Sequence, residues 1–257
     1  MLPIHHTRLH VFNYDEIPAG YYYRCMEEGH PIQRFWHREK FRQVAARIPN
    51  GARVLDVGCG PGSFLSVLVR DKPQVRAVGA DIASSQIDFA REHVLPAHPD
   101  RDLSFVTLDP RAARLPFPDA SFDVVTSIEV IEHLHPYVAI ALLNEARRVL
   151  TSEGRLIVTT PNYRSLWPFI EFALERRSPV KYHDQHISKF TPNALVKFLE
   201  CAGFDALDVR SFFVAAPFLA GLSPGLARAV QRLEMRADVL MGSLLLGEAR
   251  VNRDIAS

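Results

Sequence analysis

The chain has 257 residues, of which 47% are hydrophobic and 23% are charged, a balance typical of a globular domain with a full core. Its formal net charge of +1 gives no argument for a nucleic-acid or acidic partner. The cysteines, Cys25, Cys59 and Cys201, lie too far apart for a disulfide framework or a zinc spacing, so we expect a reducing, cytoplasmic location. The sequence shows no signal-peptide pattern, and no apolar run reaches the roughly 18 residues of a membrane span.

The segment before the first expected strand contains a helical pattern and many aromatic residues. Apolar residues recur at helical spacing over residues 34–48, and Pro49-Asn50-Gly51 ends the pattern. The aromatics cluster in Tyr21-Tyr22-Tyr23 and Phe35-Trp36-His37. One interpretation is that these side chains simply cap the sheet.

The next stretch, Val54-Leu55-Asp56-Val57-Gly58-Cys59-Gly60-Pro61-Gly62, is the most informative in the chain. With the amphipathic segment Ser63–Arg70 it predicts a strand, a tight turn and a helix. Glycines allow a ligand to lie against bare backbone, and a helix N-terminus offers unpaired N–H groups, so the turn predicts a bound cofactor. The G-x-G-x-G spacing differs from the dinucleotide G-x-G-x-x-G motif, and no Gly-Lys-Ser/Thr follows as in a P-loop.

Two acids indicate which cofactor this is. Asp56 precedes the first glycine by two residues, where it would repel a pyrophosphate but would suit a ligand with an ammonium group. Asp81 closes the next expected strand, Val75–Asp81, where an acid can accept both ribose hydroxyls. An acid near an amino group and an acid on a ribose together fit S-adenosylmethionine.

From about Gly51 to Phe204 the chain resembles the class I S-adenosylmethionine-dependent methyltransferases, including the ubiquinone-pathway O-methyltransferases. The resemblance implies that the glycine turn holds the methionine part of the cofactor, that Asp81 holds the ribose and that Ile82 packs on the adenine. It assigns Asp109 to the adenine amino group, although a proline and basic residues follow where relatives are commonly acidic. The cofactor-binding residues that it implies are Asp56, Gly58, Cys59, Gly60, Gly62, Asp81, Ile82, Asp109 and Ser127.

Strands and helices alternate along the rest of the chain. We expect strands at 103–109, 122–128, 155–160, 204–213 and 241–251, a turn at 151–154, and helices at 84–94 (with Ser84 as N-cap), 136–150 and 192–201. The alternation predicts an α/β fold with helices on both faces of a parallel sheet. The resemblance makes it a Rossmann-like, doubly wound, seven-stranded and mostly parallel sheet with an antiparallel last strand.

The fourth expected strand ends in Ser127-Ile128-Glu129-Val130-Ile131-Glu132-His133-Leu134. In open α/β folds, ligands bind outside the carboxyl ends of the strands, where this stretch is expected to lie. If a helical turn begins there, Glu129, Glu132 and His133 share one face. Such a set is either a general-base constellation or part of a metal site. Methyl transfer to a hydroxyl needs alignment and proton removal, so we predict His133, with Glu129 beside it, as the catalytic residues.

A similar Glu-x-x-Glu-His stretch occurs in the small-RNA 2′-O-methyltransferases and the ubiquinone-pathway O-methyltransferases, which use a divalent ion there. In the RNA group a further histidine lies five residues before a threonine that opens a helix, and here His186 lies five residues before Thr191. The resemblance therefore nominates Glu129, Glu132, His133 and His186 as ligands of Mg²⁺ or Mn²⁺. Because Glu-His-Leu after this strand is also common in metal-free relatives, a scaffold role is the alternative.

Two further segments accompany the core elements. Residues 162–190 form an insertion with an amphipathic stretch at 166–174 and a basic cluster, and the resemblance implies that it covers the pocket; a solvated loop is the alternative. Residues 214–240 form a helical insertion with an apolar stripe of Leu226, Val230, Leu233, Ala237 and Leu240 and a basic row of Arg228, Arg232 and Arg236. We expect this helix to cover the core, with peripheral membrane contact as the alternative.

The resemblance implies an N-terminal helical lid (residues 1–50) over the cofactor and a methyltransferase domain (residues 51–257). The expected reaction moves a methyl group from S-adenosylmethionine to a hydroxyl of a small molecule, lipid precursor or glycan. The alternatives are a metal-dependent RNA 2′-O-methyltransferase, although no basic face of the usual kind is seen, and a methyltransferase-like binding protein without turnover. Pro61 and Asp56 disfavour a dehydrogenase. Fold alone does not reveal the acceptor.

Overall fold

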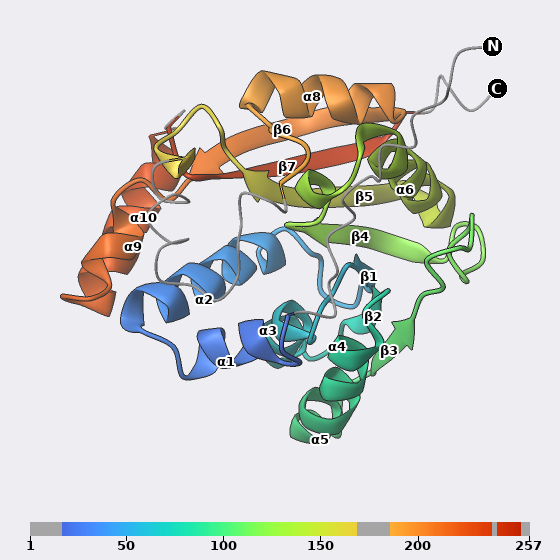
Figure 1. The fold of residues 1–257 in the computed structure, drawn as a ribbon, viewed down its shortest axis with the longest axis horizontal. Coiled ribbons are helices and arrows are strands. Elements are labelled where there is room, and N and C mark those ends of the chain that lie inside the picture. The colour runs from blue at the N-terminus through green and yellow to red at the C-terminus, as the bar shows by residue number, and fades with distance from the viewer. Residues whose placement is uncertain (1–16, 169–185, 238–240, 253–257) are drawn as a thin grey trace, which may run out of the picture.

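The computed structural model describes residues 17–168, 186–237 and 241–252, and a seven-stranded sheet runs through its middle (Figure 1). The strand order is β3-β2-β1-β4-β5-β7-β6. The strands are β1 (Arg53–Val57), β2 (Arg76–Asp81), β3 (Leu103–Thr107), β4 (Phe122–Ile128), β5 (Leu150–Pro161), β6 (Phe204–Phe212) and β7 (Leu244–Val251). β7 runs antiparallel to both β5 and β6, whereas β1 to β5 pair in parallel. The predicted fold class is therefore confirmed.

Helices cover both faces of the sheet. One face carries α1 (Tyr21–Glu27), α2 (Pro31–Ala45), α3 (Ser63–Asp71), α4 (Ser84–Phe89), the π-helical turn η2 (Ala90–Val94), α5 (Leu95–Ala97), α9 (Ala216–Leu219) and α10 (Pro224–Arg236). The other carries α6 (Pro136–Val149) and α8 (Pro192–Cys201). Neighbouring strand residues enter opposite cores, as Val54 and Leu55 do, because side chains alternate along a strand. None of the described helices has the length and apolar character needed to cross a bilayer.

Several predicted boundaries are wrong at element ends. Residues 151–154, predicted as a turn, belong to β5, whose first residue Leu150 pairs with Phe122 before a register shift restores the parallel ladder. β3 ends at Thr107, so Asp109 lies in the following loop. The N-cap of α4 is Ala83, not Ser84, and its N–H donates to the carboxylate of Asp81.

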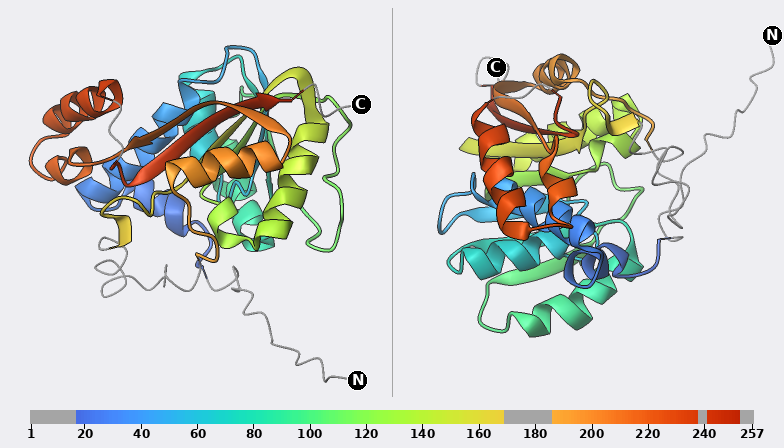
Figure 2. Two further views of the ribbon diagram at one scale, coloured as in Figure 1. Left: turned by 90° about the horizontal axis from the view of Figure 1, so that it is seen from above. Right: turned by 90° about the vertical axis from the view of Figure 1, so that its left-hand side faces the viewer.

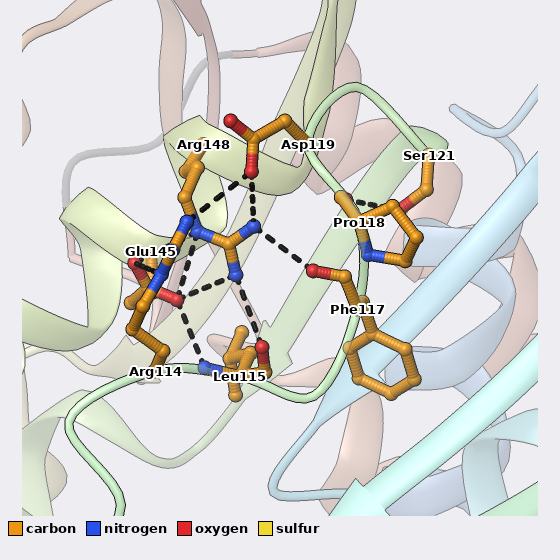
Figure 3. A network of polar contacts seen from close by, with 8 residues as sticks. All are labelled: Arg114, Leu115, Phe117, Pro118, Asp119, Ser121, Glu145 and Arg148. Atoms are coloured by element: carbon orange, nitrogen blue, oxygen red, sulfur yellow. Dashed lines mark hydrogen bonds and ion pairs between the residues drawn. The ribbon is translucent and has the colours of Figure 1, made fainter.

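The loop that leads into β4 is held by a guanidinium on α6 (Figure 3). Arg148 binds the carboxylates of Asp119 and Glu145 at 2.6 and 2.7 Å, and it donates to the carbonyls of Leu115 and Phe117. These bonds raise the pKa of Arg148. Because every partner belongs to this loop or to the same helix, the network is structural and keeps the start of β4 in place.

The expectation that α10 covers the core is confirmed, because Ala227 belongs to the core and Val230 packs against it, but the leucines of the predicted stripe do not take part. Leu226 and Leu233 are 49% and 62% exposed, whereas Ala227, Gln231 and Glu234 are the buried residues of the helix. Leu240, residues 169–174 of the predicted amphipathic stretch 166–174, and the predicted basic cluster of Arg176, Arg177 and Lys181 lie outside the described residues. The leucine stripe thus faces away from the core.

Candidate functional site

The three glycines between β1 and α3 all have positive φ, but they serve different purposes. A Cβ at Gly58 would lie 2.4 Å from a methyl of Val130, and one at Gly62 would lie 2.7 Å from the ring of Phe105. A Cβ at Gly60 would meet nothing within 4 Å. Gly58 and Gly62 are therefore required by packing, and Gly60 is the position where a ligand can approach bare backbone.

Asp81, at the end of β2, joins this turn to the neighbouring strand. Its carboxylate accepts the N–H of Gly60 and the N–H of Ala83, each at 2.8 Å. Burial raises the pKa of Asp81, and these backbone donors partly oppose the rise. Ile82 follows with 46% of its surface exposed, although it is a large apolar side chain. The strands β1 and β2 are parallel neighbours (Figure 1). Gly60, Asp81 and Ile82 thus bring bare backbone, a carboxylate and an apolar side chain to the adjoining ends of these strands.

Asp56 lies buried in β1, where the hydroxyl of Thr126 donates to its carboxylate at 2.6 Å. Burial raises the pKa of Asp56 to about 7, and the charge of Asp81 adds to the rise. Burial and the same two acids raise the pKa of the Cys59 thiol well above its usual range, so Cys59 stays protonated and packs as an apolar residue. A cation placed beside Asp56 would favour its ionised form.

Asp109 and Ser127 lie in contrasting surroundings. Asp109 is exposed, and its carboxylate accepts the N–H of Arg111 at 2.9 Å, as expected of an acid that shapes its own loop. Ser127 is 2% exposed in β4, and its hydroxyl has no hydrogen-bond partner in the described chain. The buried hydroxyls of Thr159 and Thr160 in β5 also lack described partners. Orphaned polar atoms at strand ends are groups that a ligand or water would satisfy.

At the carboxyl end of β4, Glu129 adopts a φ of 55°, and the 3₁₀ turn η3 (Ile131–His133) begins two residues later. Glu129 is therefore outside the helical turn, and the predicted shared face of Glu129, Glu132 and His133 is wrong. Its carboxylate instead accepts a hydrogen bond from the ammonium of Lys40 on α2 at 2.7 Å. Lys40 is 4% and Glu129 is 27% exposed at the side chain.

Glu132, His133 and His186 come together, although His186 lies more than 50 residues further along the chain. One ligand atom from each lies within 4.8 Å of the others, and the two imidazole centroids are 5.0 Å apart. Glu132 is fully buried, and neither carboxyl oxygen has a hydrogen-bond partner among the described residues. Burial and the nearby charge of Glu129 raise the pKa of Glu132 well above its usual range. Three of the four predicted metal ligands thus form one cluster.

Sequence reasoning missed the residues that hold His186. The hydroxyl of Tyr163, two residues beyond β5, lies 2.8 Å from Nδ1 of His186, and the ring of Trp167 lies 6.4 Å from its imidazole. The N–H of Ser188 donates to the carbonyl of Glu132 at 2.9 Å, which ties the two loops together. Nothing in the local pattern distinguished Tyr163 from an ordinary loop residue.

An aromatic cluster from three distant segments lies beside these histidines. The ring centroid of Trp36 on α2 lies 5.7 Å from that of Trp167 and 4.6 Å from that of Phe213, which follows β6. Trp36 and Lys40 stand one helical turn apart on α2. The sequence pattern could have identified Lys40. It is a charged residue four positions after Trp36 and four before Val44, so it interrupts the apolar row of the helix.

The N-terminal segment also reaches the carboxyl end of β2. The side-chain oxygen of Gln86 on α4 accepts the N–H of Gly20 at 3.0 Å, and its amide nitrogen donates to the carbonyl of Ile17 at 3.0 Å. Gln86 lies only five residues beyond Asp81. These bonds hold residues 17–20 close to the end of β2.

Comparison with known proteins gives consistent matches. A family model described as a methyltransferase domain matches residues 29–209. A probable S-adenosylmethionine-dependent methyltransferase of Mycolicibacterium smegmatis is 32% identical over 74% of this chain and 65% of its own length. A ubiquinone biosynthesis O-methyltransferase of Xylella fastidiosa is 33% identical over 65% of this chain and 66% of its own length.

Among solved structures, an S-adenosylmethionine-dependent methyltransferase from Thermotoga maritima superposes with a TM-score of 0.62 at 19% identity. The superposition covers 89% of this chain and 94% of that one, and at this identity it establishes the fold. The match to this chain covers slightly less than two thirds of the length of each of these two curated relatives.

Proposed function

The chain belongs to the class I S-adenosylmethionine-dependent methyltransferases, and we propose that it transfers a methyl group from this cofactor to a hydroxyl group. The acceptor that we favour is a small molecule, lipid precursor or glycan. The observation that carries the proposal is that two sets of groups lie at the carboxyl ends of neighbouring parallel strands. Gly60 follows β1, and Asp81 and Ile82 lie at and directly after the end of β2. The cluster of Glu132, His133 and His186 comes from the segments after β4 and β5.

The residues at the first of these places fit the cofactor. Gly60 leaves room at the backbone, Asp81 retains acceptor lone pairs for ribose hydroxyls, and the exposed Ile82 offers an apolar surface for an adenine ring. Asp56 lies close enough to Asp81 for their charges to interact, and in its ionised form it would favour an ammonium group. When bound, S-adenosylmethionine supplies a methyl group on a positively charged sulfur.

At the second place His133 is our candidate general base. A neutral imidazole accepts a proton near neutral pH, which is what a hydroxyl must lose as it attacks the methyl carbon. The rings of Trp36, Trp167 and Phe213 give the neighbouring surface an apolar character. This surface supports an acceptor with an apolar or aromatic body, and the ubiquinone biosynthesis O-methyltransferase among the relatives is in agreement with transfer to an oxygen.

As an alternative to His133 as the base, we propose a divalent ion, Mg²⁺ or Mn²⁺, on Glu132, His133 and His186, because an imidazole whose lone pair binds a metal cannot accept a proton. A buried carboxyl without hydrogen bonds is costly unless it is protonated or paired with a cation. The three donor atoms lie close enough to surround one ion. Glu129 is not included, because the ammonium of Lys40 already neutralises it.

Calorimetry with Mn²⁺ tests the metal on the wild type, on His186→Ala and, as a control, on His98→Ala, whose imidazole contacts Ser66 on α3. We expect binding that His186→Ala abolishes and His98→Ala preserves. Absence of Mn²⁺ binding to the wild type would leave the cluster as a metal-free scaffold.

The methyl-transfer proposal is tested in two steps. Calorimetry first measures S-adenosylmethionine binding, and transfer of a labelled methyl group is then followed with a catechol, a fatty acid, a sugar and a short RNA as acceptors. We expect binding and labelling of an acceptor with an apolar body. Labelling of the RNA alone would favour the RNA 2′-O-methyltransferase alternative, and binding without labelling of these acceptors or of a cell extract would favour a binding protein. A chain that binds no cofactor would refute the proposal.

A further inference from the structure

The helix α10 turns a mixed side toward the body of the protein, where Val230 and Met235 also pack against the core, and it leaves its two large leucines in solvent. Its buried residues are Ala227, Gln231 and Glu234. Leu226 and Leu233 stand two helical turns apart on a different side and are 49% and 62% exposed. An ordinary surface helix packs its large apolar side chains on the core.

Glu234 fixes this rotation. Its carboxylate, 8% exposed, accepts the N–H groups of Val214, Ala215 and Ala216 at 3.1, 2.7 and 3.1 Å. These are the residues that lead into α9, so α9 and α10 are joined by charge-assisted hydrogen bonds. Turning the leucines inward would break these bonds and would remove Glu234 from its donors. The exposure of the leucines is therefore a consequence of the packing.

Two further large apolar side chains of the α9–α10 region are exposed. Phe218 is 51% exposed on α9, and Leu222 is 83% exposed between the two helices. With Leu226 and Leu233 they form what we name the α9–α10 face. The two helices stand together at one end of the molecule, away from the middle of the sheet (Figures 1 and 2). Several large exposed apolar side chains in one region of this kind mark interaction sites.

A basic row runs beside the apolar stripe. Arg228, Arg232 and Arg236 follow one another at one-turn intervals, and all three are exposed. In the described part of the chain none of them forms an ion pair with a carboxylate. The acid of the same helix, Glu234, is buried on its backbone donors. The row is therefore available to an anionic partner.

We propose that the α9–α10 face docks on an anionic lipid bilayer, with Phe218, Leu222, Leu226 and Leu233 entering the interface and the arginine row meeting lipid headgroups. An apolar stripe flanked by arginines is the pattern of a helix that lies in the membrane plane. A second copy of the chain fits less well, because a symmetric dimer would bring the arginine row of one copy close to that of the other. The proposal does not depend on methyl transfer.

Sedimentation with lipid vesicles tests this surface without cofactor or acceptor. The wild type is mixed with vesicles of phosphatidylcholine alone and with vesicles that also contain phosphatidylglycerol. We expect partitioning onto the second kind, which falls with added salt. Each basic residue contributes about 1 kcal/mol near an anionic surface, so Arg232→Glu with Arg236→Glu should weaken binding at least about 30-fold. Leu226→Ser with Leu233→Ser should weaken it by a similar factor, because both apolar side chains are lost from the interface.

Two matched controls keep the result specific. Leu207→Ser removes a 48% exposed leucine from β6, and Arg76→Glu reverses a charge on β2, which lies in the other half of the sheet. Both should bind vesicles like the wild type. Equal binding to the two kinds of vesicle, or equal loss in the controls, would overturn the proposal. A stable dimer that the leucine substitutions dissociate, without vesicle binding, would assign the face to a second copy instead.

Discussion

The ammonium of Lys40 lies 2.7 Å from the carboxylate of Glu129, which joins α2 to the carboxyl end of β4 across 89 residues of sequence. The contact brings the N-terminal segment to the strand end where the candidate chemistry lies. Glu129 is a costly residue at this place, because it has a positive φ and its second carboxyl oxygen has no described partner. The ion pair with Lys40 offsets part of this cost.

Removal of Lys40 should therefore cost stability. Lys40→Met leaves Glu129 without its cation, and we expect a loss of about 1–3 kcal/mol in the free energy of unfolding, since Glu129 is partly exposed. The double variant with Glu129→Gln should recover part of that loss, because no unpaired carboxylate remains. Urea unfolding measures both, with Lys197→Met on the exposed side of α8 as control. Additive losses in the double variant would mean that the two residues are not coupled.

Gly60 and Gly58 should respond differently to alanine. Gly60→Ala meets no protein atom, so we expect it to fold with a loss of about 1 kcal/mol from its positive φ, yet to lose S-adenosylmethionine binding. Gly58→Ala places a methyl against Val130 and should lose about 3 kcal/mol. Thermal unfolding and calorimetry separate the two effects. Unchanged cofactor affinity in Gly60→Ala would show that no ligand approaches this backbone.

Asp81 should matter more to cofactor binding than Asp109. Asp81→Ala removes a carboxylate that we assign to both ribose hydroxyls, so affinity should fall at least about 100-fold. Asp109→Ala should weaken binding less than about 10-fold, because Asp109 is exposed in the loop after β3 and its carboxylate shapes that loop through the N–H of Arg111. Calorimetry on both variants compares them directly. Equal losses would restore Asp109 as a direct adenine contact.

His133→Ala should slow methyl transfer without weakening cofactor binding. Loss of a general base typically lowers the rate about 10² to 10⁴-fold. S-adenosylmethionine affinity should stay unchanged, since the groups that we assign to the cofactor, Gly60, Asp81 and Ile82, belong to the ends of β1 and β2 and not to the segment after β4. Turnover and calorimetry are read together, with His98→Ala as control. If the variant turns over at the wild-type rate, the general base is another group.

The pKa of Asp56 predicts a pH-dependent stability. Its pKa is raised from 3.8 to about 7 by burial, so the protonated form stabilises the fold. That contribution is fully present below about pH 4 and is lost as the pH rises through about 7, an effect of up to about 4 kcal/mol. Asp56→Asn should remove it, which urea unfolding between pH 4 and 8 can measure.

Cofactor binding should show the opposite dependence on pH. A cationic ligand favours the ionised carboxylate, so affinity should increase as the pH approaches 7, and the increase should disappear in Asp56→Asn. If both proteins gain affinity equally with pH, the titrating group is not Asp56.

The sequence alone determined the elements and the cofactor turn, because these depend on neighbouring residues. Alternating apolar residues and glycines at fixed spacing specify strands and tight turns locally, so the positions of β1, β2 and β4, the turn at Gly60 and the place of Asp81 were all predicted. The Glu132–His133 pair was located for the same reason. The resemblance to a known family added His186.

Only the tertiary structure decided which side chains meet at that place and which face α10 exposes. Lys40, Trp36 and Phe213 arrive from segments far apart in sequence, and the charge on Lys40 removes Glu129 from the predicted constellation. In α10 the helical period predicts a stripe but not its direction. The hydrogen bonds between Glu234 and the residues leading into α9 set that direction, because a buried carboxylate must keep its donors.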